Sequence, residues 1–210
     1  LASSDAGARD YGVDLFSDPN LAISTDIDGE IRSGTWDIGA DEYVAGPTPL
    51  YRSVGTNGAN LNTGGWSVRI EGTVATFAGS MPNNIGIGDV ITYNTGTPQL
   101  AFIHGRTSST VFTVKNKNGG TPTQALGNYA NGVYRAYTSL ANWQSQTENP
   151  NISEPTENDV NPSKDLVTTK TMLNVACYGD GVDSTGFTIT GWSTSADRYI
   201  KIYTPTSTNQ

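Results

Sequence analysis

The chain has 210 residues, which is enough for one large domain or two small ones. Its formal net charge of −8 repels the phosphates of nucleic acids and anionic lipids, so neither is expected as a partner. The single cysteine, Cys177, excludes a disulfide within the chain, and no apolar run reaches the roughly 18 residues that span a membrane.

Residues 1–45 form an Asp-rich segment that ends in "DIDGEIRSGTWDIGADEY", from Asp26 to Tyr43. Aspartates bond nearby backbone N–H groups in turns, and glycines adopt positive φ angles. These residue types suit a segment that closes the open edge of a strand stack. The segment lacks a signal peptide and starts at Leu1, so we expect a processed product or a piece of a longer chain.

A boundary is expected near "VAGPTPLYRS", Val44–Ser53, where two prolines and a glycine interrupt the pattern. Beyond it, residues 50–210 alternate between apolar and polar side chains, which is typical of β-strands. Strands are predicted at these positions: two within Trp66–Gly79, then Val90–Tyr93, Leu100–Arg106, Thr110–Lys115, Gly132–Thr138, and three in the stretches 171–181, 185–192 and 197–205.

One short helix is predicted in "LANWQSQTEN", residues 140–149, with Ser139 as its N-cap. The Pro/Asn/Glu-rich stretch Glu148–Asp165 is interpreted as a long surface loop. The predicted fold is therefore all-β. It is a mostly antiparallel β-sandwich or barrel with one short helix, preceded by a segment that resembles a β-helix end cap.

The first segment resembles the last coil of secreted right-handed parallel β-helix proteins. The residues that carry this resemblance are Asp26, Asp28, Gly29, Arg32, Asp37, Ile38, Gly39, Ala40, Glu42 and Tyr43, with "DAG" at Asp5–Gly7 before them. The resemblance covers about the first 45 residues.

The remainder resembles an uncharacterised β-rich module of large bacterial and archaeal surface proteins. It does so in "YRSVGTN", "GDVITY", "FIHGRTSSTVFTV", "YRAYTSLANW", "LNVACYGDG" and "YIKIYTP". These resemblances imply an extracellular, modular context and no particular reaction.

Two places carry oxygen ligands that would suit Ca²⁺, the only cofactor considered. They are Asp26 with Asp28, and Asp180 with Asp183 in the turn "YGDGVDSTG". The regular ladder of a calcium loop is missing, and turn formation alone explains Asp-Gly pairs. A structural interpretation without a cofactor is therefore preferred at both places.

No catalytic residue is assigned from the sequence; Cys177 and His104 are the candidates for a thiol-based pair, since a thiolate nucleophile needs a neighbouring base. No local signature links these two residues, and a cysteine in a strand is usually a buried apolar side chain. A pair of carboxylates, as in glycosidases, also stays open, because spacing in sequence does not give separation in space. The chain is more consistent with a protein that is not an enzyme.

Tryptophans Trp66, Trp143 and Trp192 are the candidate ligand-binding residues, because exposed rings can stack on the apolar faces of sugars. Only 15% of the residues are charged, and Ser, Thr, Asn and Gly fill the surface, as in many secreted β-proteins. The leading hypothesis is an extracellular structural or adhesive module of a cell-surface or filament-forming protein, which self-assembles into a homo-oligomer or filament. The alternative is a carbohydrate-binding or polysaccharide-acting accessory domain.

Overall fold

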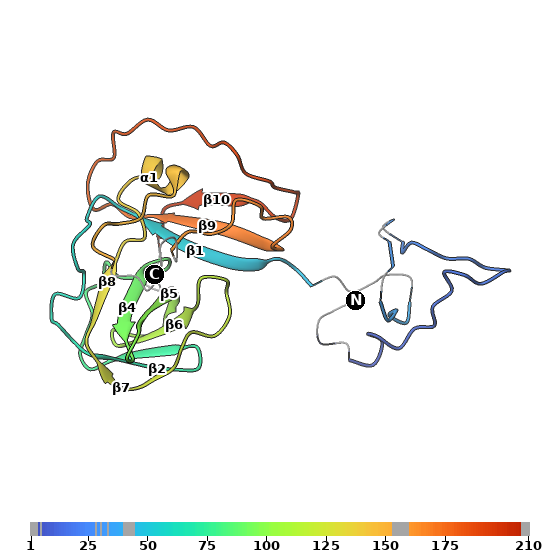
Figure 1. Ribbon diagram of the computed structural model, residues 1–210, viewed down its shortest axis with the longest axis horizontal. Coiled ribbons are helices and arrows are strands. Elements are labelled where there is room, and N and C mark those ends of the chain that lie inside the picture. The colour runs from blue at the N-terminus through green and yellow to red at the C-terminus, as the bar shows by residue number, and fades with distance from the viewer. Residues whose placement is uncertain are drawn as a thin grey trace. The chain divides into compact units, whose positions relative to one another are not determined.

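The chain divides into two units, Leu1–Gly46 and Pro47–Gln210, in a computed structural model (Figure 1). The structure describes residues 4, 6–27, 29, 31–32, 34–39, 45–152 and 160–206. The two units are described separately below. None of the helices in these ranges is long and apolar enough to span a membrane.

The first unit is built from turns and extended segments around a small buried centre. Arg32 lies over the ring of Trp36, with 5.2 Å between the guanidinium carbon and the ring centroid, and it donates to the carbonyl of Gly39 at 2.6 Å. Asp37 accepts a hydrogen bond from the backbone N–H of Asp10 at 2.6 Å. Asp26 is also buried, whereas Asp28 lies outside the described residues.

The main part of the second unit is an antiparallel sheet of seven strands that curls into a nearly closed barrel (Figure 1). Its spatial order is β7-β2-β3-β6-β5-β4-β8. The strands are β2 (Val68–Glu71), β3 (Val74–Phe77), β4 (Val90–Asn94), β5 (Pro98–Arg106), β6 (Val111–Lys115), β7 (Ala125–Tyr129) and β8 (Asn131–Tyr134). The predicted all-β, mostly antiparallel fold class is confirmed.

Alternation along these strands sends every second side chain into the barrel, because successive residues of a strand face opposite sides. Ile91 and Tyr93 of β4 point inward, as do Ala101 and Ile103 of β5. The remaining buried members of this core are Leu61, Val68, Ile70, Ala75, Phe77, Met81, Ile85, Phe112, Val114, Ala125 and Val133. The barrel interior is therefore a filled hydrophobic core.

A second, parallel sheet of three strands has the order β1-β9-β10. Its strands are β1 (Thr48–Val54), β9 (Thr171–Cys177) and β10 (Ile200–Tyr203). Leu50, Leu173 and Ile200 occupy one level of the stack, and Arg52, Val175 and Ile202 the next level on the same face. The sequence analysis did not predict a parallel sheet. Strand β1 begins inside Val44–Ser53, where a boundary is expected, just after the division between the two units at Gly46 and Pro47.

The chain between β9 and β10 makes one complete turn of a coil. Leu173 pairs in parallel with Ile200, and Asp165 forms a parallel bridge with Ser193. The two pairings join residues that are separated by nearly the same length of chain, so successive turns of chain stack directly on one another. Residues 164–203 therefore follow the geometry of a parallel coil. All of the barrel strands come between β1 and β9 in the chain, so the barrel is an insertion between two strands that pair with each other.

The second hydrophobic core joins the parallel sheet to the helix α1 (Leu140–Ser145) and to the barrel, which contributes Val90 of β4 and Phe102 of β5. Trp143 of α1 is fully buried, and its ring stacks on that of Trp192 at 5.5 Å between centroids. The Ser139 N-cap is confirmed, since its side chain accepts from the N–H of Asn142. The helix is shorter than predicted, because Gln146 adopts a left-handed conformation with φ of 59° and ends it.

Two further expectations about secondary structure were wrong. Strand β7 was missed, and residues 185–192 form no strand although alternation predicted one there. In that stretch Phe187 instead lies edge-on against Trp143, with ring centroids 6.4 Å apart. Within the predicted loop Glu148–Asp165, residues 153–159 lie outside the described ranges, whereas Ile152 and Val160 join the second core.

Replacing Gly88 by alanine is expected to destabilise the fold far more than replacing Gly96. Both glycines have positive φ angles, +89° and +107°, so either alanine adds roughly 1–2 kcal/mol of backbone strain. Only at Gly88 would the new Cβ meet backbone, 2.5 Å from the nitrogen of Ser53 and 2.6 Å from the carbonyl carbon of Arg52. We expect losses in the free energy of unfolding of about 1 kcal/mol for Gly96→Ala and at least about 3 kcal/mol for Gly88→Ala, measured by chemical denaturation. Equal losses would contradict this close approach.

Candidate functional site

A buried cluster of charged side chains lies where the barrel meets the parallel sheet. We call Arg135, Asp89 and Asp180 the junction cluster. The Nη1 of Arg135 lies 2.8 Å from both carboxylate oxygens of Asp89. Its Nε and Nη2 contact the two oxygens of Asp180 at 2.7 and 2.9 Å. Arg135 follows β8, Asp89 precedes β4 and Asp180 follows β9, so the cluster joins both sheets.

The surroundings of the junction cluster satisfy its remaining hydrogen-bonding groups. The carbonyl of Asn84 accepts from Nη2 of Arg135 at 3.0 Å, and the N–H of Gly86 donates to Asp89 at 3.0 Å. The ring of Tyr178 covers the guanidinium at 3.6 Å, and its hydroxyl donates to the carbonyl of Ile87. Such complete satisfaction is what a buried ionic group requires to be tolerated.

The cluster contains one cation and two carboxylates, and this imbalance sets its electrostatics. Burial by itself lowers the pKa of Arg135, but Asp89 and Asp180 outweigh burial and raise that pKa above its ordinary value. At Asp89, burial outweighs the charge and the hydrogen bonds of Arg135, and it raises the pKa of Asp89 above its ordinary value. The side chains of Arg135 and Asp89 are fully inaccessible, which makes this cluster a structural junction and not a ligand site.

Of the two candidate calcium pairs, Asp26 with Asp28 lies partly outside the described residues, and the two members of the second pair, Asp180 and Asp183, have other partners. Asp180 belongs to the junction cluster, where the charge of Arg135 opposes a second cation. Asp183 accepts from the backbone N–H groups of Leu140 and Thr185, and these bonds lower its pKa. Across the part of the chain that the structure describes, no group of three or more His, Cys, Asp or Glu side chains could hold a metal ion. Calcium binding stays an untested prediction.

His104 is the extra residue of a β-bulge between β5 and β6, because Ile103 pairs with Val114 and Gly105 with the adjacent Thr113. Its ring meets Tyr51 edge-on at 4.8 Å, and its buried Nε2 has no hydrogen-bond partner. Burial, with the charges of Arg52 and Lys115, lowers the pKa of His104 to about 4. The imidazole is therefore neutral near pH 7.

Cys177 is the last residue of β9 and is half-buried. Burial, followed by the charge of Asp183, raises the pKa of its thiol. A raised thiol pKa is the opposite of what a nucleophile requires. The structure records no hydrogen bond between Cys177 and His104, both of which it describes, so it provides no support for the proposed pair.

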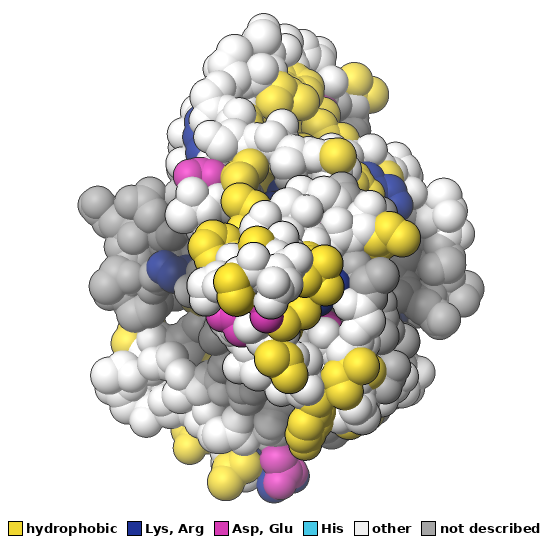
Figure 2. Space-filling model, turned by 90° about the vertical axis from the view of Figure 1, so that its right-hand side faces the viewer, with side chains coloured by type: hydrophobic (Ala, Val, Ile, Leu, Met, Phe, Trp, Pro, Cys, Tyr) yellow, Lys and Arg dark blue, Asp and Glu magenta, His cyan; other side chains and the backbone are white. Residues whose placement is uncertain are grey.

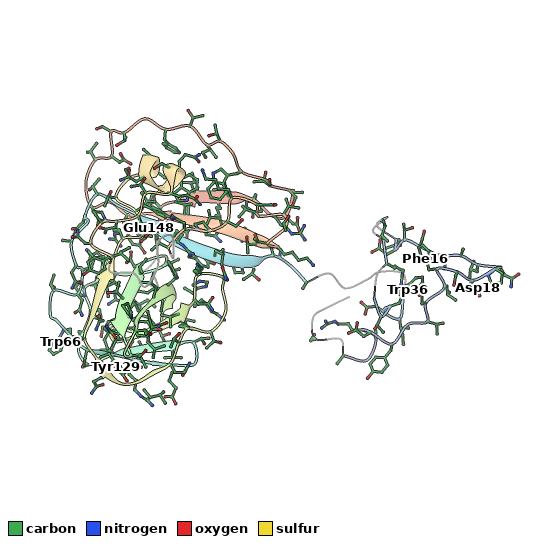
Figure 3. All side chains as sticks on the ribbon, viewed as in Figure 1. Phe16, Asp18, Trp36, Trp66, Tyr129 and Glu148 are labelled. Carbon is green, nitrogen blue, oxygen red and sulfur yellow. The ribbon has the colours of Figure 1, made fainter. Side chains whose placement is uncertain are left out.

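The three candidate tryptophans do not form one platform. Trp143 and Trp192 stack on each other in the second core, and the indole N–H of Trp192 donates to Gln144 at 2.9 Å. Trp66 precedes β2 and lies by the barrel, away from that core (Figure 3). Trp66 is 42% exposed, and its indole fits over Gly64 and Gly79, where any side chain would overlap the ring.

Strand β10 presents an open edge that the sequence analysis did not identify. The N–H of Leu173 donates to the carbonyl of Tyr199 at 3.1 Å, which directs Lys201 and Tyr203 toward β9. The backbone groups of Ile200 and Ile202 therefore point away from β9, and no described strand pairs with them. The sequence does carry a signal for this pairing. The segments "LNV" (173–175) and "IKI" (200–202), which pair in the sheet, both place one polar residue between two apolar ones.

The opposite edge of the parallel sheet, along β1, is partly occupied. The N–H of Ser53 donates to the carbonyl of Gly88 at 2.9 Å, and its carbonyl accepts from Tyr137 at 3.1 Å. The carbonyl of Tyr51 accepts from Arg52 at 2.8 Å, and Pro49 has no N–H group to offer. Among the described strands, β1 and β10 are thus the two outer strands of the parallel sheet, and Ser53 of β1 already has partners for both of its backbone groups.

Comparison of the chain with protein families, with curated proteins and with solved structures finds no match. The functional argument therefore rests on the geometry of the chain itself.

Replacing Arg135 by methionine is expected to cost about 3–5 kcal/mol in the free energy of unfolding at pH 7, because it leaves buried carboxylates without their cation. Arg69→Met is the matched control. It breaks the pair with Glu71, whose side chains are 45% and 61% exposed, and should cost at most about 1 kcal/mol. Chemical denaturation of both variants gives the comparison, and equal losses would refute the structural role of the cluster.

The decrease in the free energy of unfolding caused by Arg135→Met should also be smaller in acid. Without Arg135, burial acts unopposed on Asp89, whose pKa in the folded state is then raised further. A carboxyl with a raised folded-state pKa contributes stability below its ordinary pKa, and this contribution disappears as pH rises through the folded-state value. Denaturation at several pH values should therefore show a deficit that grows between about pH 4 and pH 7.

Proposed function

We propose that this chain is an extracellular structural module that assembles with other chains through exposed sheet edges and apolar surface. It would serve in a cell-surface or filament-forming protein. The observation that carries this proposal is the open edge of β10 at the end of a stacked parallel coil. The low charge content and the resemblance of the segments to surface-protein modules support the extracellular location.

An open strand edge is a template for another strand, because its N–H and C=O groups are unpaired. Within the described residues, the apolar level that begins with Leu50 and Leu173 has Ile200 as its last member. The next level has Ile202 as its last member, and Ile202 is 37% exposed. A further strand on this edge would continue both levels and satisfy the outward backbone groups. Strand addition is a general mode of protein recognition and needs no catalytic group.

The first unit also supports an assembly function through its exposed apolar surface. Tyr11 and Val13 are 69% and 75% exposed, and an open hollow of about 650 Å³ is lined mainly by apolar side chains. Figure 2, which draws both units together, shows hydrophobic side chains at many points, with acidic and basic side chains beside some of them. Apolar patches of this kind on small units are typical of interaction surfaces.

The proposal predicts that the purified chain self-associates with increasing concentration. The net charge of −8 opposes association, so salt should strengthen it. Raising the ionic strength from about 0.01 M to 0.15 M shortens the Debye length from about 30 Å to 8 Å and weakens this repulsion. Sedimentation velocity over a wide concentration range is the measurement. A single monomeric species at the highest soluble concentration, at both ionic strengths, would refute self-assembly.

A second candidate function, binding of polysaccharide, is favoured by the placement of Trp66 alone. Its backbone is held by two amides, since Asn62 and Asn131 both donate to its carbonyl, at 2.8 and 2.6 Å. A rigid, partly exposed indole loses little conformational entropy on binding, which suits stacking against the apolar face of a sugar.

Trp66→Ala tests this candidate, with Val74→Ala as the control because Val74 is also 42% exposed but is not aromatic. If the chain binds a polysaccharide, the association constant obtained by affinity electrophoresis should fall by at least about fivefold for Trp66→Ala, which corresponds to the loss of one stacking contact of about 1 kcal/mol or more. It should be unchanged for Val74→Ala. Binding that survives Trp66→Ala would exclude this ring as the site.

A further inference from the structure

We infer that the partner of β10 is the β10 strand of a second copy, paired antiparallel about a two-fold axis with Ile202 opposite Ile202. This inference rests on the proposed assembly function and specifies its interface. Two three-stranded sheets would then join into one continuous six-stranded sheet. Three features of the strand support it: the edges that are available, the registers that they permit and the side chains on each face.

The backbone bonds of Ser53 on β1 hinder the main alternative between copies, which is head-to-tail stacking of parallel sheets. Such stacking would need the free side of β1 to receive β10 of the next copy. Ser53 is already bonded to Gly88 and Tyr137, and Pro49 lacks a donor. An interface in which β10 meets itself uses the same surface on both copies and closes, as two-fold dimers generally do.

The direction of the backbone groups limits the register. In an antiparallel pair, residues whose N–H and C=O point at the partner lie opposite residues of the same kind. On β10 the outward residues are Ile200 and Ile202, and Lys201 points its groups at β9. The two-fold axis must therefore place some residue of β10 opposite the same residue of the second copy. Registers that set an outward residue opposite an inward one are not available.

Charge then selects among the registers that remain. An axis at Lys201 would place two lysine side chains directly opposite each other, which is unfavourable. An axis at Ile202 instead places Lys201 opposite Tyr203 of the second copy, and does so twice. These two side chains already attract within one strand, where the Lys201 ammonium lies 5.2 Å from the Tyr203 ring centroid. Cation–π contacts of this type are favourable across strands as well.

The apolar face favours the same register. Ile202 lies on the side of the sheet that packs on the second core, and it is 37% exposed because its level of the stack ends there. Opposite Ile202 of the second copy, each side chain covers the other, and the cores beneath the two sheets become continuous. An axis at Ile200 would instead set Ile202 opposite the charged Arg198. Each Ile202 would also exchange two backbone hydrogen bonds with its counterpart.

Cross-linking through Ile202→Cys tests this register in a Cys177→Ser background, which removes the native thiol. Residues in a hydrogen-bonded antiparallel pair have Cα atoms about 5.5 Å apart, within the range that a disulfide spans. Mild oxidation should give a covalent dimer at least about tenfold faster than for two control cysteines. These are Lys201→Cys, which would face Tyr203 of the second copy, and Leu126→Cys, which is 58% exposed on β7.

The outcomes separate the two proposals. Preferential dimer formation by Ile202→Cys supports the inferred interface. Faster cross-linking of either control, or no cross-linking of any variant while sedimentation still shows association, overturns the inferred interface and leaves the assembly function standing. A chain that remains monomeric in sedimentation overturns both.

Ile202→Pro provides a second test that does not depend on disulfide chemistry. Proline removes the outward N–H of residue 202, and the ladder to β9 does not use that group. The dimer dissociation constant should rise by roughly tenfold or more, since both copies lose a hydrogen bond. Ile202→Val keeps the N–H and should change the constant much less. Equal dissociation constants for the two variants, with thermal unfolding unchanged, would overturn the inference.

Discussion

The buried guanidinium of Arg135 is the interaction on which the arrangement of the second unit depends. Its two carboxylate partners come from different sheets, Asp89 from the start of β4 and Asp180 from the chain after β9. Paired buried charges contribute little net stability compared with an apolar core, but a mispaired one is severely unfavourable. The cluster therefore acts mainly by penalising every other way of docking the parallel sheet on the barrel.

This docking also decides which side of the parallel sheet is available. Ser53 is the link between the two effects, because its backbone bonds to Gly88 and Tyr137 while its side chain accepts from the N–H of Ala136. Each of these partners is a close neighbour in sequence of Asp89 or Arg135. The same contacts that fix the barrel against β1 occupy that edge at Ser53, whereas no described strand pairs with the outward side of β10.

Sequence patterns predicted the elements whose environment is decided locally. Strict alternation in "VRIEGTVATF" and "VFTVK" identified β2, β3 and β6, because one face of each fills the barrel. The pattern failed where distant partners decide, since β1 has buried residues on both faces and β7, "ALGNY", has a single buried residue and a central glycine. The candidate sites show the same limit. Only the fold brings Arg135 to Asp180, and only the coil stacks Trp143 on Trp192.

Lys201 affects which strand registers the open edge of β10 permits. Lysine on an edge strand usually protects against unwanted pairing. On β10, however, the backbone groups of Lys201 point inward at β9, and its side chain lies on the face opposite the second core. Its charge therefore does not prevent a strand from joining at Ile200 and Ile202. Its charge disfavours only the register in which two lysines lie opposite each other. A residue type that prevents pairing on other edge strands therefore selects one register on β10.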